Sequence, residues 1–457
     1  MEQQAFHHAL KIRHDVCTGC SHCMKVCPTE ALRVHGGKAL LYPVWCIDCG
    51  ECHRVCPTRA IVVEDDDFKD IFRYRRRILL IPSIFIGQFG ATVSRREIMD
   101  ILLHLGFTDV REAEHSVDFL IDEINRYLQT HEKPVISSFC PAVTRLIQIR
   151  FPALVDHVLR LKQPLEVTTE YFRQWYARQG VDPADVGIFY LTPCAAKIAS
   201  IKAPVGDYAS PIDGVINMNY MYNRVLQERG KELPATTHET QVSARGMTWS
   251  LTGGEVRHID GKGLAIDGIE NVVEFLERIE NDEISGVDYL ELRACDESCS
   301  GGILTPYNRF LAAECIRLNA QAQASANDAI DEYRQYLSGA IDVGQIRPRS
   351  MVKYDLDITK ALQKMEKARE LKRALPGVDC GACGAPSCEA LAEDIVRGQA
   401  AVEHCIFIQT RSEKQGLLPQ EQAIKIMEKI WGKEKIDECA IRDEEMKTYQ
   451  TERHIIK

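Results

Sequence analysis

The residues of this chain with the clearest capacity for chemistry are its cysteines. There are 18 among 457 residues, and sixteen of them fall into four sets of four. In a reducing compartment, cysteines at close spacing favour metal or redox chemistry over disulfides. Cys315 and Cys439 fall outside the sets, and we interpret them as ordinary cysteines. The spacing within each set then indicates which metal it would bind.

Residues 15–64 contain an internal repeat in which each half reads C-x2-C-x2-C-x3-C-P. With this spacing, three cysteines bind one cubane and the fourth binds the neighbouring one. Zinc sites usually pair two C-x2-C knuckles instead. The repeat resembles a bacterial two-cluster ferredoxin and implies one-electron transfer. Its expected 4Fe-4S ligands are Cys17, Cys20, Cys23 and Cys56 for one cluster, and Cys46, Cys49, Cys52 and Cys27 for the other.

Four more cysteines follow segments that read as buried strands. Where strands alternate with helices, ligands bind where the chain leaves the carboxyl ends of the strands. Alone, Cys295 and Cys299 would equally fit two ordinary buried cysteines, since free cysteine is often found inside proteins. Together the four supply the number of thiolates that a cubane needs. The set is Cys140, Cys194, Cys295 and Cys299.

The fourth set lies near the C-terminal end of the sequence and reads C-x2-C-x4-C-x16-C. It resembles the small single-cubane domain of corrinoid iron-sulfur proteins and related electron carriers, with zinc as the alternative. Glycines in this loop let the backbone turn close to inorganic sulfide, and Ser387 can cap the helix that follows. The expected ligands are Cys380, Cys383, Cys388 and Cys405.

Between these cysteines, strand-like and helix-like segments alternate. A helix is predicted at 94–105 with Ser94 as its cap, and a charged helix at 357–375. A helix is also predicted to begin at Pro141, because proline is permitted at the first helical position. Another is predicted to follow Cys194. A further tail helix carries Ile424, Met427 and Trp431 on one stripe, which favours packing against the protein. The predicted strands are 78–85, 134–138, 186–191 and 287–292.

This alternation predicts an α/β and α+β multidomain chain. The expected domains, in order, are a two-cluster ferredoxin-like module at 1–66, a two-lobed mixed α/β domain at 67–345, a helical connector at 346–375, a small helical 4Fe-4S domain at 376–412 and a C-terminal helical tail at 413–457.

The composition of the chain limits the classes of partner that it can bind. The hydrophobic fraction of 45% and the charged fraction of 27% are typical of a soluble globular protein. A net charge of -10 disfavours nucleic acid and anionic membrane, because both require basic surface. No apolar run reaches the ~20 residues of a membrane span, and the first residues lack a secretory apolar segment. We therefore expect a cytoplasmic protein without a nucleic-acid or membrane partner.

The ferredoxin-like repeat followed by three cysteine loops in this order resembles the FeFe hydrogenases. The resemblance covers about residues 12–340, including PSIFIGQFG and LGFTDV at the family's first strand and helix. SSFCPAV matches the family's first cysteine loop, and TPCAAK matches its second. ACDESCSGG matches the third, with one residue fewer before the glycines. Thr252-Gly253-Gly254 fits the family's TGG turn.

The resemblance implies that 67–345 is an H-cluster domain. In the family, a cubane is joined through one cysteine to a di-iron centre bearing cyanide, carbon monoxide and an azadithiolate. By this resemblance Cys140, Cys194, Cys295 and Cys299 would bind the cubane, and Cys299 would bridge to the di-iron unit. Lys197 would hold a cyanide, as an ammonium facing a fixed anion. Its alternative role is a solvated helix lysine.

The sequence also departs from the family's pattern. Catalytic members carry a cysteine at the position of Phe139, where it relays protons to the azadithiolate nitrogen. A phenyl ring can neither donate nor accept a proton, and removing a positioned acid-base group typically costs ~100- to 10,000-fold in rate. Thr192 stands in place of a methionine, and Leu159 in place of a relay serine. The relay's glutamates have no secure counterpart, and the nearest acids are Asp118, Asp122 and Glu123.

These departures resemble the family's sensory branch, which lacks the relay cysteine and often has an extra C-terminal cluster. No segment of PAS-domain length is present, which fits the subgroup without that domain. We therefore expect a slow FeFe hydrogenase that interconverts H2 with protons and electrons and reports hydrogen or redox state. Its expected cofactors are the H-cluster and three auxiliary 4Fe-4S clusters. Its expected partners are a ferredoxin-type electron donor or acceptor, maturation enzymes and a signalling protein.

A different class of function stays open. The chain would then be a hydrogenase-like iron-sulfur electron-transfer or scaffold protein with no di-iron centre, similar to relatives in cytosolic cluster assembly. Phe139 favours this alternative, because its ring would fill space that the di-iron ligands need. Lys197 and the complete ferredoxin-like repeat favour the hydrogenase. An electron carrier that uses four cubanes within a larger complex shares most expectations of the alternative.

Overall fold

The structure is a computed structural model, and it describes residues 6–90, 92–206, 208–231, 233, 242–323, 330–337 and 341–437. Within these ranges the chain forms two compact units. The first unit comprises 6–9, 47–50 and 63–348, and the second comprises 10–46, 51–62 and 349–437. Cys439 and the part of the predicted tail beyond residue 437 lie outside the described residues.

The first unit is built on two parallel sheets. The larger sheet has the strand order β6-β5-β8-β9, and the smaller has the order β10-β11-β7. Parallel strands joined by helices are buried on both faces, and all seven residues of β8 are buried. The strands are β5 (Arg76–Ile81), β6 (Asp109–Glu112), β7 (Val135–Ile136), β8 (Val186–Thr192), β9 (Gly214–Asn217), β10 (Gly263–Asp267) and β11 (Tyr289–Arg293).

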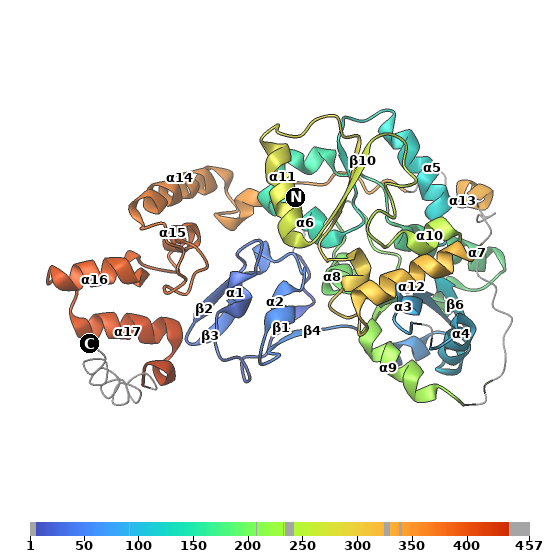
Figure 1. Ribbon diagram of the computed structural model, residues 1–457, viewed down its shortest axis with the longest axis horizontal. Coiled ribbons are helices and arrows are strands. Elements are labelled where there is room, and N and C mark those ends of the chain that lie inside the picture. The colour runs from blue at the N-terminus through green and yellow to red at the C-terminus, as the bar shows by residue number, and fades with distance from the viewer. Residues whose placement is uncertain are drawn as a thin grey trace, which may run out of the picture. The chain divides into compact units, whose positions relative to one another are not determined.

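Helices surround these sheets (Figure 1). The amphipathic helix predicted after Ser94 is α4, and the Ser94 hydroxyl accepts a hydrogen bond from Glu97 N as expected of a cap. The helices of the first unit are α3 (Ser83–Gly87), α4 (Arg95–His104), α5 (Val117–Leu128), α6 (Pro141–Arg150), α7 (Pro164–Arg178), α8 (Ala195–Lys202), α9 (Met218–Glu228), α10 (Ala244–Thr248), α11 (Ile269–Glu280), α12 (Arg309–Gln321) and α13 (Ile330–Leu337).

The strand predicted at 78–85 was wrong at its carboxyl end. Strand β5 stops at Ile81, and Pro82 precedes the short helix α3. Proline lacks the N–H that a central strand donates, so an apolar run that continues past Pro82 can no longer be strand. The apolar residues 83–87 are buried as a helix instead.

The second unit combines the ferredoxin-like segment with the C-terminal segment. Strands β1 and β4 pair with each other, and β2 and β3 form an antiparallel hairpin. The charged helix predicted at 357–375 is α14, and Ser387 caps α15 by accepting from Ala390 N. The elements are β1 (Leu10–Ile12), α1 (His22–Lys25), β2 (Leu32–His35), β3 (Lys38–Leu41), α2 (Glu51–Val55), β4 (Ile61–Val63), α14 (Ile358–Ala374), α15 (Cys388–Val396), α16 (Ile406–Lys414) and α17 (Gln420–Trp431).

A buried ion pair joins two distant segments of this unit. Arg33 on β2 forms a two-point contact with Asp394 on α15, with Nε at 2.6 Å from Oδ2 and Nη2 at 3.1 Å from Oδ1. Arg33 Nη1 donates to the carbonyl oxygens of Glu30 and Leu32. All three nitrogens of the guanidinium therefore donate a hydrogen bond, as a buried cation requires.

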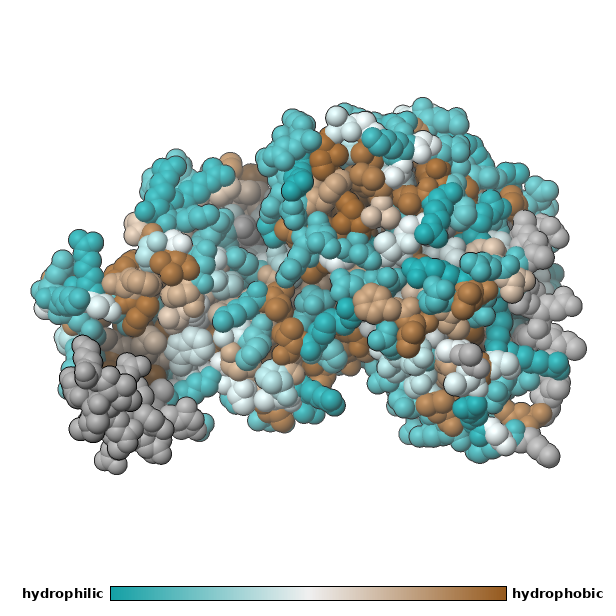
Figure 2. Space-filling view, in the orientation of Figure 1, coloured by the Kyte–Doolittle hydropathy of each residue, from teal (hydrophilic) through white to brown (hydrophobic). Residues whose placement is uncertain are grey.

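The predicted tail helix is α17, but its apolar stripe is rotated from the expected one. Ala423 and Ile430 are buried, whereas Ile424 is 44% exposed. Hydrophobic side chains elsewhere on the visible face form scattered patches among hydrophilic ones (Figure 2). Among the described residues, no helix combines the length and apolar content that crossing a membrane would require.

Candidate iron-sulfur centre of the first unit

The cysteine loops of the first unit begin where three strands end. Cys140 follows β7 and is the residue before α6, and Cys194 follows β8 and is the residue before α8. Cys295 and Cys299 follow β11, and Cys299 lies in a single 3-10 turn that spans Ser298–Gly301. Cys194 comes from the larger sheet and the others from the smaller one. The two sheets thus contribute thiols from different directions.

The structure brings Cys140, Cys194 and Cys299 close enough to interact electrostatically. Burial and the nearby Cys299 together raise the pKa of Cys194 to about 12, against the effect of Lys197, which lowers it. Burial also raises the pKa of Cys299. Cys295 lies just before the 3-10 turn of Cys299, and its carbonyl accepts from Ser298 N at 3.0 Å. Buried thiols of this kind ionise when a metal supplies the compensating positive charge.

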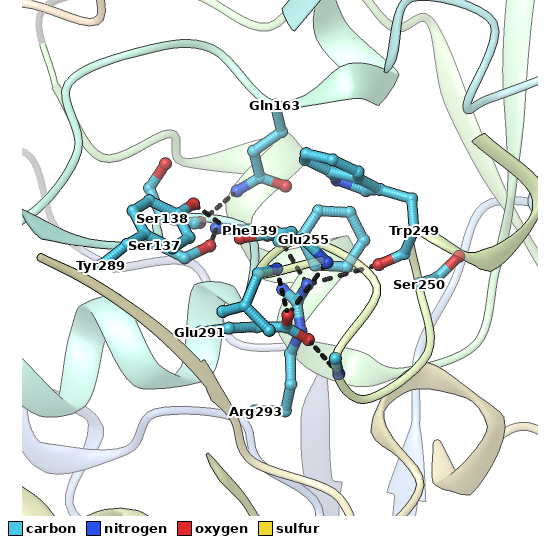
Figure 3. Close-up of polar contacts among 12 residues, drawn as sticks. Ser137, Ser138, Phe139, Gln163, Trp249, Ser250, Glu255, Tyr289, Glu291 and Arg293 are labelled. Carbon is cyan, nitrogen blue, oxygen red and sulfur yellow. Dashed lines mark hydrogen bonds and ion pairs between the residues drawn. The ribbon is translucent and has the colours of Figure 1, made fainter. Parts of the chain in front are cut away.

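The Phe139 ring contacts two buried cations, of which Figure 3 shows Arg293. Its ring centroid is 4.0 Å from Arg293 Cζ and 4.2 Å from Lys197 Nζ. Lys197 is 4% exposed and Arg293 is 1% exposed, so the predicted site lysine is not a solvated helix lysine. The loop before Cys140 is held by two hydrogen bonds, from Phe139 N to Ser137 Oγ and from Gln163 Nε2 to Ser138 O.

Arg293 belongs to a buried network of acids on the smaller sheet (Figure 3). Its Nη2 donates to Glu255 Oε1 at 2.7 Å, and Glu255 Oε2 accepts from Tyr289 OH at 2.6 Å. Glu291 accepts from three backbone N–H groups, that of Gly253 in the TGG turn and those of Glu255 and Val256 directly after it. The turn matched from sequence thus binds the carboxylate that sits two residues from Arg293 on β11.

Several buried donors in these loops have no hydrogen-bond partner among the described residues. They are Arg293 Nε and Nη1, Trp249 Nε1, and the hydroxyls of Ser298 and Ser300. Buried polar groups are normally paired, because an unpaired one costs about 1–3 kcal/mol. The two serines flank Cys299, and Arg293 interacts electrostatically with Cys299 and Cys140. The donor set therefore fits a bound group rich in sulfide or other anionic acceptors.

Sequence reasoning missed one acid near this centre. Glu114 accepts from Ser250 Oγ at 2.7 Å and from Ser83 N at 3.0 Å. Burial raises the pKa of Glu114 to about 7, against hydrogen bonds that lower it. Glu114 also interacts electrostatically with Cys299, and Cys299 N donates to Ser250 O at 3.2 Å. An acid that titrates near neutrality is suited to exchanging protons.

The acids named from sequence for the relay lie in ion pairs instead. Asp118 is 2.8 Å from Arg245 Nη2, and Asp122 is 2.7 Å from Arg334 Nη2. Glu123 pairs with Arg126 one turn along α5 at 2.6 Å. Leu159 is buried, and the Thr192 hydroxyl donates to Cys194 O at 3.0 Å. Each of these three carboxylates thus has an arginine partner.

The second unit holds the other predicted sets. Burial raises the pKa of Cys23 to about 12, with Cys20, Cys17 and Cys56 as its charged neighbours. Burial likewise raises the pKa of Cys383 to about 11, and Cys380 and Cys405 lie nearby. In each of these two sets the thiols named here thus lie near one another, and their assignment as cluster ligands stays a prediction. Of the remaining set, Cys27, Cys46 and Cys52 belong to this unit, whereas Cys49 belongs to the first.

Three segments of the chain match known protein families. Residues 78–260 match the family model of the iron only hydrogenase large subunit, C-terminal domain. Residues 16–61 match a 4Fe-4S dicluster domain, and residues 375–407 match an Fe-S cluster family.

The chain is 23% identical over 200 residues to the NADP-reducing hydrogenase subunit HndD of Solidesulfovibrio fructosivorans, covering 41% of this chain and 31% of that one. It is 54% identical over 35 residues to one component of the Na(+)-translocating ferredoxin:NAD(+) oxidoreductase complex of Acetobacterium woodii, covering 8% of this chain and 10% of that one. The chain thus spans about a third or less of the length of these curated relatives.

Solved structures of [FeFe]-hydrogenases also align with the chain. A structure of HydA(deltaEFG) that reports stepwise H-cluster assembly has 16% identity and a TM-score of 0.47, covering 62% of this chain and 97% of that one. A variant of HydA1 from Chlamydomonas reinhardtii has 15% identity, the same coverage and a TM-score of 0.47.

Proposed function

Taking the chain as a hydrogenase-like iron-sulfur protein related to the FeFe hydrogenases, we propose that it binds an H-cluster in the first unit. Cys140, Cys194, Cys295 and Cys299 would hold the cubane, with Cys299 as the bridge to a di-iron centre. The protein would then interconvert H2 with protons and electrons at low turnover. When bound, the H-cluster supplies an open iron site and an internal base. The protein orients the cluster, excludes water from it and conducts electrons to it.

One observation carries this proposal. Two cations, Lys197 and Arg293, are buried beside thiols, and Arg293 keeps two N–H groups without a hydrogen-bond partner among the described residues. Burying a cation is costly unless an anion compensates it. Glu255 and Glu291 form ion pairs with Arg293, and its two remaining N–H groups, together with Lys197, leave capacity for a further anion. Cyanide ligands are fixed anions of this kind, and a cubane alone would place its charge on the sulfides and thiolates. Lys197 and Arg293 would therefore orient the di-iron unit.

Phe139 limits the expected rate. Phe139 occupies the position at which catalytic relatives carry a thiol that passes protons to the azadithiolate. Its ring also contacts both Lys197 and Arg293. Slow turnover suits a reporter of hydrogen or redox state better than a bulk catalyst. We propose that electrons enter and leave through the cluster sites of the second unit by way of a ferredoxin-type carrier. Maturation enzymes would install the di-iron centre.

The test is infrared spectroscopy of the full-length, anaerobically reconstituted protein loaded with a synthetic di-iron azadithiolate complex. Sharp cyanide and carbonyl bands that shift under H2 are expected. The Cys299→Ser variant should lose them, because the bridging thiolate is gone. Cys315→Ser is the matched control, since Cys315 lies outside the four sets and donates to Gly90 O. Absence of protein-bound bands in the unsubstituted chain would contradict the proposal.

A second candidate is favoured by the position of Phe139. The Phe139 ring already stabilises both buried cations without any ligand, by about 0.5–2 kcal/mol for each cation-π contact. The protein would then be an electron-transfer or scaffold protein that holds only cubanes. Metal analysis giving iron in multiples of a cubane, after in vitro maturation, would support this candidate over the hydrogenase.

A sensory role would need a partner that responds to hydrogen. Ile424 on α17 is 44% exposed, which makes this helix a candidate docking face for a signalling protein. Ile424→Glu should weaken hydrogen-dependent binding of such a partner in a pull-down with and without H2. Leu417→Glu, which alters an exposed apolar residue outside the helix, is the control. Equal binding by both variants and the unsubstituted chain would exclude α17 as that surface.

A further inference from the structure

Two cluster-binding loops of the second unit touch each other through Met24 and Gly381. Met24 follows Cys23, and Gly381 follows Cys380. Met24 is 1% exposed, and a Cβ placed on Gly381 would lie 3.2 Å from the Met24 methyl carbon. Each loop thus contributes the residue next to a predicted ligand. The predicted cluster of Cys17, Cys20, Cys23 and Cys56 and the C-terminal cluster would be separated by little more than this contact.

Two side chains from the tail hold both loops at once. Trp431, at the end of α17, donates from Nε1 to Ala382 O at 2.8 Å. Lys435 donates from Nζ to Gly19 O at 2.8 Å, and its ammonium is 5.4 Å from the Trp431 ring centroid. Ala382 lies between Cys380 and Cys383, and Gly19 lies between Cys17 and Cys20. One short segment therefore fixes the backbone of the two cysteine loops relative to each other.

Backbone hydrogen bonds extend this junction along the β2–β3 hairpin. Val34 N donates to Gly384 O at 2.8 Å, and Gly36 N and Gly37 N donate to the carbonyls of Lys429 and Ile430. Gly384 has φ +78°, and a Cβ there would lie 2.3 Å from Val34 O. Only glycine permits so close an approach of the loop to the strand. The Arg33–Asp394 ion pair lies in the same region.

We propose that these contacts form an electron-transfer junction, in which the C-terminal cluster exchanges electrons directly with the Cys17, Cys20, Cys23 and Cys56 cluster. One electron moves at a time, so one cubane is oxidised as the other is reduced, and no bond or proton is involved. Cys380 is exposed, whereas Cys17 and Cys23 are buried. The C-terminal cluster is therefore the end at which an external one-electron carrier reacts. This inference requires clusters in both sites but no di-iron centre.

The test uses the full-length chain with reconstituted cubanes and no di-iron complex. The C-terminal cluster's electron paramagnetic resonance signal is identified by its loss in the Cys383→Ser/Cys388→Ser double variant. In the fully reduced unsubstituted chain, this signal should be broadened and fast-relaxing because a second paramagnet lies nearby. A narrow, slowly relaxing C-terminal signal at full reduction would overturn the proposal. Because no di-iron centre is present, failure here leaves the proposed hydrogenase function untouched.

Two glycine variants probe the contact itself. Gly384→Ala forces the loop away from Val34, whereas Gly398→Ala has a similar positive φ of +72° and no atom within 4 Å of the new methyl. With equal iron content, Gly384→Ala should lose the broadening and Gly398→Ala should keep it. If Gly384→Ala fails to retain its clusters, a Trp431→Phe/Lys435→Met double variant is used instead, because it removes the tail hydrogen bonds to Ala382 O and Gly19 O that hold the two loops together. Equal broadening in all retained variants would contradict the junction.

Discussion

Each unit contains a buried arginine with carboxylate partners, and the two differ in how fully they are satisfied. Arg33 in the second unit uses all three guanidinium nitrogens, toward Asp394 and two backbone carbonyls. Arg293 in the first unit donates from Nη2 to Glu255 and Trp249 O, and its Nε and Nη1 have no hydrogen-bond partner within the described ranges.

The difference separates a structural ion pair from a binding group. A buried charge whose hydrogen bonds are all made has no remaining demand for a ligand, and its removal should damage the fold. A buried charge with unpaired N–H groups, close to thiols, has capacity left for an anion. Arg33 is therefore expected to stabilise the second unit, and Arg293 to prepare a site in the first.

The largest effect is expected from Phe139, whose ring covers one face of Arg293. In protein loaded with the di-iron complex, Phe139→Cys would restore a proton-relaying thiol and raise H2 turnover by ~100-fold or more. Phe139→Ala opens the same space without a thiol and is the matched control. Turnover is measured by H2 production with a reduced one-electron donor. An equal gain in both variants would show that space, and not proton transfer, limits the rate.

Breaking the satisfied arginine should destabilise the second unit. Arg33→Met removes one of the two arginine partners of the buried Asp394, which also pairs with Arg397. Removing one member of a buried pair costs up to about 3–5 kcal/mol. Arg54→Met provides the comparison, because the Arg54–Glu51 pair on α2 is partly exposed and such pairs contribute about 0–1 kcal/mol. Denaturant unfolding followed through cluster absorbance measures both. Equal midpoints for the two variants would refute the structural role of Arg33.

Glu114 gives the first unit a pH dependence of its own. Its pKa rises from 4.5 to about 7 on burial, so the folded state keeps the proton while the unfolded state releases it. The contribution of Glu114 to stability is therefore fully present below about pH 4.5, and roughly 3 kcal/mol of it is lost as pH rises to about 7. Glu114→Gln should flatten this decline. Unfolding of the first unit, followed by fluorescence of the buried Trp249, would show an unchanged slope if Glu114 is not responsible.

Removing Arg293 should cost less stability than removing Arg33, because Glu255 stays hydrogen-bonded to Tyr289. Arg293→Met removes the bond to Glu255, whereas Glu291 keeps its three backbone donors. A charged hydrogen bond contributes about 1.5–3 kcal/mol, which is the expected upper range of the loss. The informative readout is infrared, where Arg293→Met should shift the cyanide bands of loaded protein more than Arg293→Lys does. Unchanged bands in both would remove Arg293 from the ligand shell.

Much of the fold followed from local pattern. Cysteine spacing and apolar runs predicted the strands before Cys140, Cys194 and Cys295, and capping residues predicted α4 and α15. The assignment of individual ligands and the domain boundaries remain predictions. The limit of strand β5 was missed because an apolar run was followed through Pro82, which ends a strand whatever its neighbours.

The partners of buried charges could not be predicted from sequence. Arg33 and Asp394 are 361 positions apart, and no spacing rule connects them. One signal was available for Arg293, since YLELR places Glu291 and Arg293 two apart in a buried strand and therefore on one face. Charged residues in such a position must find partners. Glu114 carried no comparable signal, because its role depends on Ser83 and Ser250 from distant segments.

The short segment 47–50 determines whether the ferredoxin-like repeat can be removed without damage to the rest of the protein. Asp48, within the second half of the ferredoxin-like repeat, is fully buried in the first unit. It accepts from Ala9 N and from Arg145 Nη1, whose side chain is also fully buried. A recombination event or an engineered truncation at residue 66 would remove Asp48 and leave Arg145 inside without this carboxylate. The sequence thus presents the repeat as a separate module, but its removal would destabilise the core of the first unit.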